Sequence, residues 1–339
     1  MKKYAIMMGM VEEVDSAIDD QRQPGAEVES NGSAAVQPTG IEELDQVLHG
    51  GFPVGHTILL AGSSGTGKTI LATQWLFEGY KKYQEPGLYI SLTEPVAKAV
   101  KNANKMSFFD KEVVNPLQIH FTDLRGIMKG LDLESKKFGR EEIDVLIGAI
   151  ANMVTQSKAK RIVMDSVTAM AYRLDNKDLV RDFIFKLGTV LAQADANVIL
   201  TSEIVGEGYS VYGVEEFISD GIIKLTREQQ RHSDPVRRLN VVKVRGSSFD
   251  AFPATYRISP DGINLFPHVY RDLKHPVSGE RVDTGVPGLD AMTSGGYFAG
   301  STVLLTGASG AGKSITSMQF IVAGLQAGQK GVYVSFEES

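Results

Sequence analysis

The chain has 339 residues, 42% hydrophobic and 22% charged, which is typical of a globular protein with a sizeable core. Its 35 Lys and Arg against 41 Asp and Glu give a net charge of −6, which argues against a protein that mainly coats nucleic acid. The lack of cysteine excludes disulfides, thiolate metal sites and cysteine nucleophiles, and the lack of any run of 18 apolar residues predicts a cytoplasmic protein without a membrane-spanning helix.

The chain begins with a segment that is expected to be a disordered tail, residues 1–37, because it is acidic and poor in large apolar residues. Residues 38–267 follow as a predicted α/β domain. Strands are expected at 56–61, 88–92, 161–164 and 197–200, and helices at 67–82, 141–157 and 177–194. From 221 to 266 the pattern becomes mostly strand. The alternation predicts a mostly parallel sheet followed by an antiparallel extension.

An internal repeat organises the rest of the chain. Residues 39–69 align without a gap with residues 284–314, and 15 of the 31 positions are identical. The repeat period is 245 residues, whereas 56 residues remain from Thr284 to Ser339. We therefore expect a linker at 268–283 and an incomplete second domain at 284–339.

Each copy contains the pattern G-x-x-x-x-G-K-[ST], in which backbone N–H groups and a helix N-terminus surround phosphate. The first consists of Gly62, Ser63, Ser64, Gly65, Thr66, Gly67, Lys68 and Thr69. The second consists of Gly307, Ala308, Ser309, Gly310, Ala311, Gly312, Lys313 and Ser314. Lys68 is expected to reach the β- and γ-phosphates of ATP, and the hydroxyls of Thr69 and Ser314 are expected to bind Mg²⁺.

Acidic residues at two strand ends are candidate partners of this loop. Asp165 ends the apolar run 161–164 and is expected to hold the Mg²⁺ shell, as the acid of a Walker B strand does. Glu94 follows the strand at 88–92 and is expected to polarise the water that attacks the γ-phosphate. The second copy has Glu337 and Glu338 at the corresponding place.

Two cations lie at alternate positions of a late strand. Lys243 and Arg245 share one face of it, just before a Gly-Ser-Ser turn. Two interpretations are open: a solvated strand face, or a positive pair that enters the nucleotide site of a neighbouring subunit and stabilises the charge of the transition state.

Together these motifs resemble the RecA superfamily and, more closely, the KaiC family of circadian-clock and clock-related ATPases. The resemblance is carried by residues 39–69, by RIVMDSVTAM and YGVEEFISDGIIKL, by VVKVRGSSFD and DGINLFP, and by the second copy ending FEES. It covers about 300 residues. It implies two RecA-like domains per chain, ATP-dependent assembly into hexamers, slow ATP hydrolysis in the first ring and Ser/Thr autophosphorylation in the second. It also implies that Lys243 and Arg245 act on a neighbour's ATP.

The sequence departs from the family's pattern at one position, since Thr93 precedes Glu94 where the first domain of the family usually has two glutamates. Two alternatives stay open, the first because the core is shared with recombinases and the second because of Thr93. One is a DNA recombination or repair ATPase, although the charge does not favour a nucleic-acid partner. The other is a scaffold that binds nucleotide without hydrolysing it and holds signalling partners.

Overall fold

The computed structural model describes residues 35–92, 94–131, 133, 138–174, 176–204, 208–209, 213, 215–229, 235–268 and 278–336. These residues form two compact units, one ending at His268 and one beyond it. Most of the predicted tail lies outside the described residues, as do Thr93, Glu337 and Glu338. None of the helices within the described ranges is long and apolar enough to cross a membrane.

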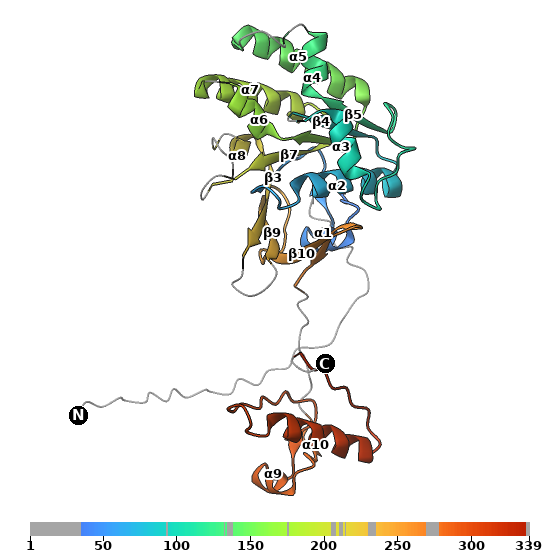
Figure 1. Cartoon of the computed structure of the whole chain (residues 1–339), viewed down its shortest axis with the longest axis vertical. Coiled ribbons are helices and arrows are strands. Elements are labelled where there is room, and N and C mark those ends of the chain that lie inside the picture. Colours follow the sequence, from blue (N-terminus) through green and yellow to red (C-terminus); the bar gives the residue numbers. More distant parts are fainter. Residues whose placement is uncertain are drawn as a thin grey trace, which may run out of the picture. The chain divides into compact units, whose positions relative to one another are not determined.

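The first unit is built on a nine-stranded sheet with the order β11-β10-β9-β8-β3-β7-β6-β4-β5 (Figure 1). Six strands run parallel: β3 (Thr57–Gly62), β4 (Gly87–Ser91), β5 (Ile119–Asp123), β6 (Arg161–Asp165), β7 (Asn197–Glu203) and β8 (Gly221–Glu228). Three strands extend the sheet in antiparallel fashion: β9 (Val236–Val244), β10 (Ala254–Ser259) and β11 (Gly262–Phe266). The predicted fold class is confirmed. The strand β5 is an addition that the sequence analysis did not predict.

Helices cover both faces of this sheet (Figure 1). One face packs against α4 (Leu124–Gly130), α5 (Arg140–Ser157), α6 (Val167–Arg173) and α7 (Lys177–Ala192). The other packs against α1 (Glu42–Val47) and α2 (Lys68–Tyr83). Two shorter helices are α3 (Val96–Ala103) and α8 (Glu215–Ile218), and a small ladder joins β1 (Val36–Gln37) to β2 (Phe52–Pro53). Covering on both faces explains why the central strands are nearly continuous apolar runs.

A buried arginine connects β6 with α2 and with the segment that follows β1. Arg161 begins β6, and its guanidinium donates to Glu85 at 2.6 Å and to the carbonyls of Thr39 and Trp75 at 2.6 and 3.0 Å. It is fully buried and lies over the Trp75 ring. Gly79 of α2 leaves room for it, because a Cβ there would lie 2.1 Å from the arginine Nε. The charge is therefore buried with its donors occupied, as a buried ion requires.

The second unit contains β12 (Arg281–Val282), α9 (Pro287–Met292), β13 (Tyr297–Phe298) and α10 (Lys313–Gln326). Residues 302–307 match β3 in sequence, yet they form no strand. In the first unit β3 is hydrogen-bonded to β7 and β8, and residues 278–336 include no counterpart of either. Backbone that has no neighbouring strand cannot form a ladder.

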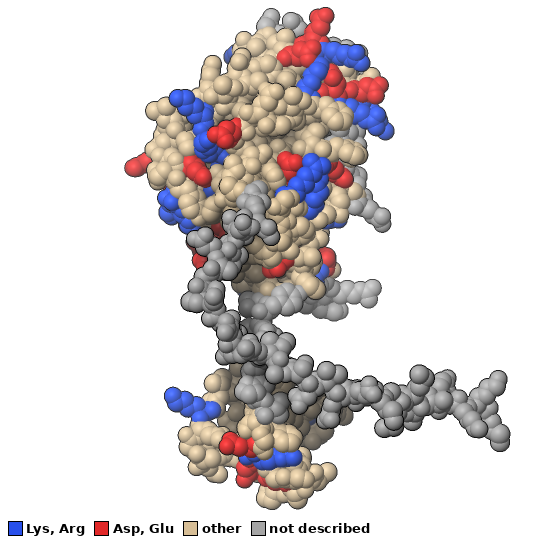
Figure 2. Space-filling model, turned by 180° about the vertical axis from the view of Figure 1, so that it is seen from behind, with Lys and Arg blue, Asp and Glu red and all other residues tan. Residues whose placement is uncertain are grey.

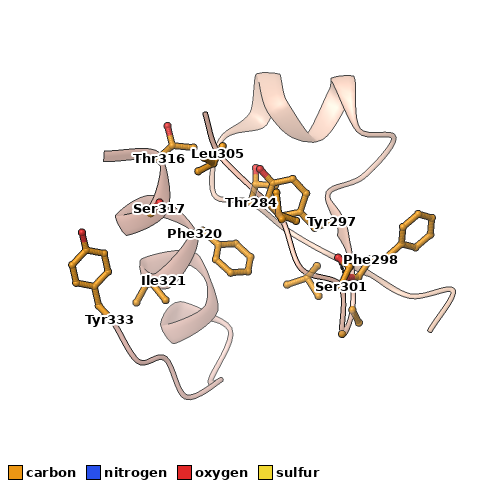
Figure 3. A pocket seen from close by; sticks show the side chains of 14 residues that line it. Thr284, Tyr297, Phe298, Ser301, Leu305, Thr316, Ser317, Phe320, Ile321 and Tyr333 are labelled. Atoms are coloured by element: carbon orange, nitrogen blue, oxygen red, sulfur yellow. Dashed lines mark hydrogen bonds between the residues drawn. The ribbon is translucent and has the colours of Figure 1, made fainter. Parts of the chain in front are cut away.

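An apolar cavity of about 280 Å³ lies between α10 and the β12–β13 ladder of this unit, and Figure 3 shows the side chains that line it. Phe320 and Ile321 of α10 contribute to its wall, together with Tyr297 and Leu305. The residues 245 positions earlier are all core residues of the first unit, namely Trp75, Leu76, Phe52 and Leu60. The cavity is therefore lined by side chains whose counterparts in the first unit are buried in its core.

Candidate nucleotide site

The first glycine-rich loop connects β3 to α2, as the sequence pattern predicts. Gly65 and Gly67 have φ angles of +78° and +96°, a region that side chains rarely adopt. A residue late in the sequence of the domain supports the loop. The buried hydroxyl of Tyr256 on β10 donates to the Thr66 carbonyl at 2.6 Å. Burial raises the pKa of Tyr256 to about 12, so this hydroxyl remains a donor at neutral pH.

Lys68 lies along the inside of the loop. Its Nζ donates to the carbonyls of Gly62 at 2.7 Å and of Ser63 at 3.0 Å. Burial lowers its pKa, while the nearby carboxylates of Glu203 and Asp165 act in the opposite direction. A phosphate held by the loop could accept from the same ammonium group, which has three protons to donate.

Asp165 stands opposite the start of α2, at the end of β6. The Thr69 hydroxyl donates to its Oδ2 at 2.6 Å, and the buried hydroxyl of Tyr89 donates to the same oxygen at 2.8 Å. Thr201 donates to Oδ1. A hydroxyl and a carboxylate in contact supply the hard oxygen donors that Mg²⁺ prefers, so these residues fit that cation.

Lys68, Thr69 and Asp165 line a cavity of about 440 Å³, a size that suits a nucleotide. Glu94 lines the same cavity, and its carboxylate is paired with Lys98 at 2.9 Å. A second carboxylate, Glu203 at the end of β7, also lines it. Two acids besides Asp165 therefore line this cavity.

Lys243 and Arg245 lie at the opposite end of the sheet. Val244 pairs with Gly221 beside Ile58, near the start of β3, whereas the loop follows the end of β3. Lys243 donates to the Ser219 carbonyl at 2.8 Å, and Arg245 is bound to Asp220 at 3.2 Å. Burial, followed by the charge of Arg245, lowers the pKa of Lys243.

The side chain of Arg245 is 60% exposed. Both cations lie beside the start of β3, at the ends of the strands that are remote from the loop. They therefore do not line the nucleotide cavity of their own unit. A role for either of them in catalysis would need a second subunit.

The second loop has the same backbone form as the first. Gly310 and Gly312 have φ angles of +79° and +87°, and Lys313 donates to the carbonyls of Gly307 and Ala308 at 2.8 and 2.9 Å. Residues 278–336 contain no counterpart of β6, however, so no carboxylate in that range faces Ser314 as Asp165 faces Thr69.

Three residues of the site were not predicted from the sequence. Tyr89 and Tyr256 lie inside strands, where an aromatic side chain reads as core packing, and only their hydroxyl contacts set them apart. Glu203 ends β7 as Asp165 ends β6, and the two parallel strands are neighbours. The position of Glu203 at the end of a buried strand could have indicated its place in the site. Of the predicted acids, Glu337 and Glu338 lie outside the described residues.

Comparison with known proteins gives consistent results. A family model described as "ATPase: KaiC" matches residues 37–270 and 282–339. The circadian clock oscillator protein KaiC of Parathermosynechococcus lividus is 34% identical over 307 residues, which cover 89% of this chain and 55% of that protein. The protein of the same name from Nostoc sp. is 32% identical over 323 residues, 95% of this chain and 61% of that protein.

Among solved structures, a KaiC-like protein from the archaeon Pyrococcus horikoshii OT3 superimposes with a TM-score of 0.60 at 29% identity. The match covers 69% of this chain and all of that one. The chain thus spans somewhat more than half the length of the curated relatives, and about one unit of it matches the archaeal structure.

Proposed function

Since the chain belongs to the KaiC family of ATPases, we propose that its first unit binds Mg²⁺·ATP at residues 62–69 and hydrolyses it slowly. The contact between the Thr69 hydroxyl and Asp165 at 2.6 Å carries this proposal. It brings the last residue of the phosphate loop and the acid of β6 together, 96 positions apart in sequence, at the wall of a cavity of suitable size.

The residues of the cavity have different roles in the proposed phosphoryl transfer. Loop N–H groups and Lys68 bind the phosphates and reduce the charge that repels an attacking water. Thr69 and Asp165 would hold Mg²⁺, which supplies Lewis-acid stabilisation of the phosphate oxygens when it is bound. Glu94 accepts a proton from the attacking water and orients it, at the cost of its pairing with Lys98.

The first test is the release of ADP from Mg²⁺·ATP by the full chain. We expect Lys68→Ala to remove turnover, because the loop loses its cation for the phosphates. The matched control is Lys313→Ala, which makes the same change in a loop of the same form. Turnover that survives Lys68→Ala and disappears with Lys313→Ala would contradict the assignment to the first unit.

The second test separates the two acids of the cavity. Glu94→Gln is expected to keep ATP binding and to lower the turnover number by about 100-fold or more, the usual effect of losing a general base. Glu203→Gln preserves size in the same way and is expected to have a much smaller effect. The reverse result would transfer the role of base to Glu203, which lines the same cavity.

We further propose that chains assemble into a ring, a hexamer in the family's manner, with Lys243 and Arg245 of one subunit acting on the ATP of the next. Their place at the strand ends remote from the loop of their own unit supports this. Lys243→Ala and Lys68→Ala subunits, each inactive alone, should regain part of the activity when mixed, because some interfaces then combine an intact loop with intact cations. No recovery on mixing would count against action between subunits.

Within residues 278–336 no strand corresponds to β6, so the described part of the second unit has no acid equivalent to Asp165 for a kinase reaction. A DNA-dependent ATPase is the rival that the same assay addresses. On the face drawn in Figure 2, basic and acidic side chains of the described residues are interspersed, without a continuous basic stripe. We therefore expect DNA not to stimulate turnover. ATP binding without ADP formation would instead favour a nucleotide-gated scaffold for signalling partners.

A further inference from the structure

Tyr89 carries a polar group into the core behind the nucleotide cavity. The residue lies in the middle of β4 and is 1% exposed. Its hydroxyl is 2.8 Å from Oδ2 of Asp165 and donates to it.

The ring of Tyr89 is fixed on its neighbours. It pairs in register with Phe121 of β5 and with Val163 of β6, two residues before Asp165. Its ring stacks on that of Phe121, with centroids 4.8 Å apart and an interplanar angle of 26°. The phenol therefore holds a rigid position on the same face of the sheet as the Asp165 carboxylate.

Asp165 accepts from three hydroxyls, which differ in what they can do when a cation binds. Thr69 belongs to the phosphate loop, and its oxygen is itself a candidate ligand of Mg²⁺. Thr201 donates to Oδ1 and Tyr89 to Oδ2, and both sit on strands beside β6. These two hydroxyls hold the two carboxylate oxygens separately, so together they fix the plane of the carboxylate.

We propose that Tyr89 is a positioning residue of the magnesium site: its hydroxyl holds Oδ2 of Asp165 in the orientation that serves the cation and thereby raises the affinity for Mg²⁺ in the ATP complex. This inference rests on the proposed function. Without the Tyr89 hydroxyl, Asp165 keeps Thr201 and Thr69 as donors. Once the Thr69 oxygen binds the cation, Oδ2 then has no donor of these three to oppose its rotation. Partners of metal ligands typically change metal affinity by about 10- to 100-fold when they are removed.

The test measures binding rather than turnover. A fluorescent ATP analogue is bound to the full chain, first with a chelator present and then with increasing Mg²⁺, and the Mg²⁺ concentration at half-maximal signal is recorded. For Tyr89→Phe we expect this concentration to rise about 10-fold. Affinity for the analogue without Mg²⁺ should stay within about twofold, because Tyr89 does not line the cavity.

Tyr80→Phe is the matched control. It also removes one tyrosine hydroxyl that is in a hydrogen bond, here with Gln118 rather than Asp165, and Tyr80 does not line the nucleotide cavity. Its Mg²⁺ midpoint should equal that of the wild type. A Tyr89→Phe protein that lost its far-UV circular dichroism would be replaced by one with 4-fluorophenylalanine at position 89, which fills nearly the same space without a donor and carries the same expectation.

The outcomes are separable. If binding of the analogue to the wild-type chain did not depend on Mg²⁺, the proposed function itself would be contradicted. A wild type that responds to Mg²⁺, with Tyr89→Phe at the same midpoint, would overturn the role of Tyr89 alone. A shift confined to Tyr89→Phe would support it, and restoration by 4-aminophenylalanine, which keeps a donor at that place, would tie the shift to the hydrogen bond.

Discussion

His56 is a residue whose environment makes stability depend on pH. It precedes β3, its backbone N–H donates to Asn197, and its Nδ1 is buried without a partner. Burial lowers its pKa from 6.5, the charge of Asp220 opposes this, and Arg245 adds to it. The unfolded chain therefore takes up a proton near pH 6.5 that the folded chain does not bind.

The stabilising contribution of neutral His56 is thus complete above pH 6.5 and is lost as the pH falls below that value. We expect the free energy of unfolding in urea to decline from pH 7 to pH 5, and His56→Gln to flatten part of this decline. His120→Gln serves as control, since it changes a histidine outside this cluster. Equal slopes for His56→Gln and the wild type would contradict the prediction.

At the same scale, the sequence predicts only part of the site. Lys68, Thr69 and Asp165 follow from spacing, because a phosphate loop and an acid at a strand end are local patterns. Glu203 and Tyr89 do not, since their roles depend on which strands are neighbours. The order β3-β7-β6-β4 decides that, and no local pattern records it.

For the elements, the helix glycines offer a matched comparison. A Cβ on Gly79 of α2 would lie 2.1 Å from Nε of the buried Arg161, whereas one on Gly148 of α5 would meet open space. We expect Gly79→Ala to lower the free energy of unfolding by about 2–4 kcal/mol, because the arginine must leave its partners. Gly148→Ala should raise it by about 0.5–1 kcal/mol through helix propensity.

Urea unfolding of both variants measures this difference. A Gly79→Ala protein as stable as Gly148→Ala would mean that Arg161 can shift without cost. The same measurement on Arg161→Met is expected to show a loss of about 3–5 kcal/mol, because Glu85 then keeps a charge without its partner.

The elements also show where local sequence is insufficient. The segments at 57–62 and 302–307 have nearly the same residues, yet only the first is a strand. The difference lies in the neighbours, since β3 has β7 and β8 beside it. A strand is a property of a pair of segments, whereas the helices α2 and α10 form in both units because their hydrogen bonds are internal.

For the whole molecule, the division into units predicts an independent first unit. The core clusters of that unit draw only on residues between Ile41 and Leu265, and Tyr256 and Asp165 lie within the same range. We expect a fragment of residues 35–268 to fold and to bind the fluorescent ATP analogue within about twofold of the full chain. Circular dichroism and titration check this, and loss of either property would show that the first unit needs the rest of the chain.

The brace between Tyr256 and the phosphate loop has a consequence for biosynthesis. The two partners, Tyr256 and Thr66, are 190 positions apart, and Gln74 of α2 likewise bonds to Ile263 across 189 positions. A ribosome has therefore made the loop long before it makes the strands that secure it. Contacts between such distant segments form late and slowly. The nascent domain should thus acquire its affinity for nucleotide only after β11 has left the exit tunnel.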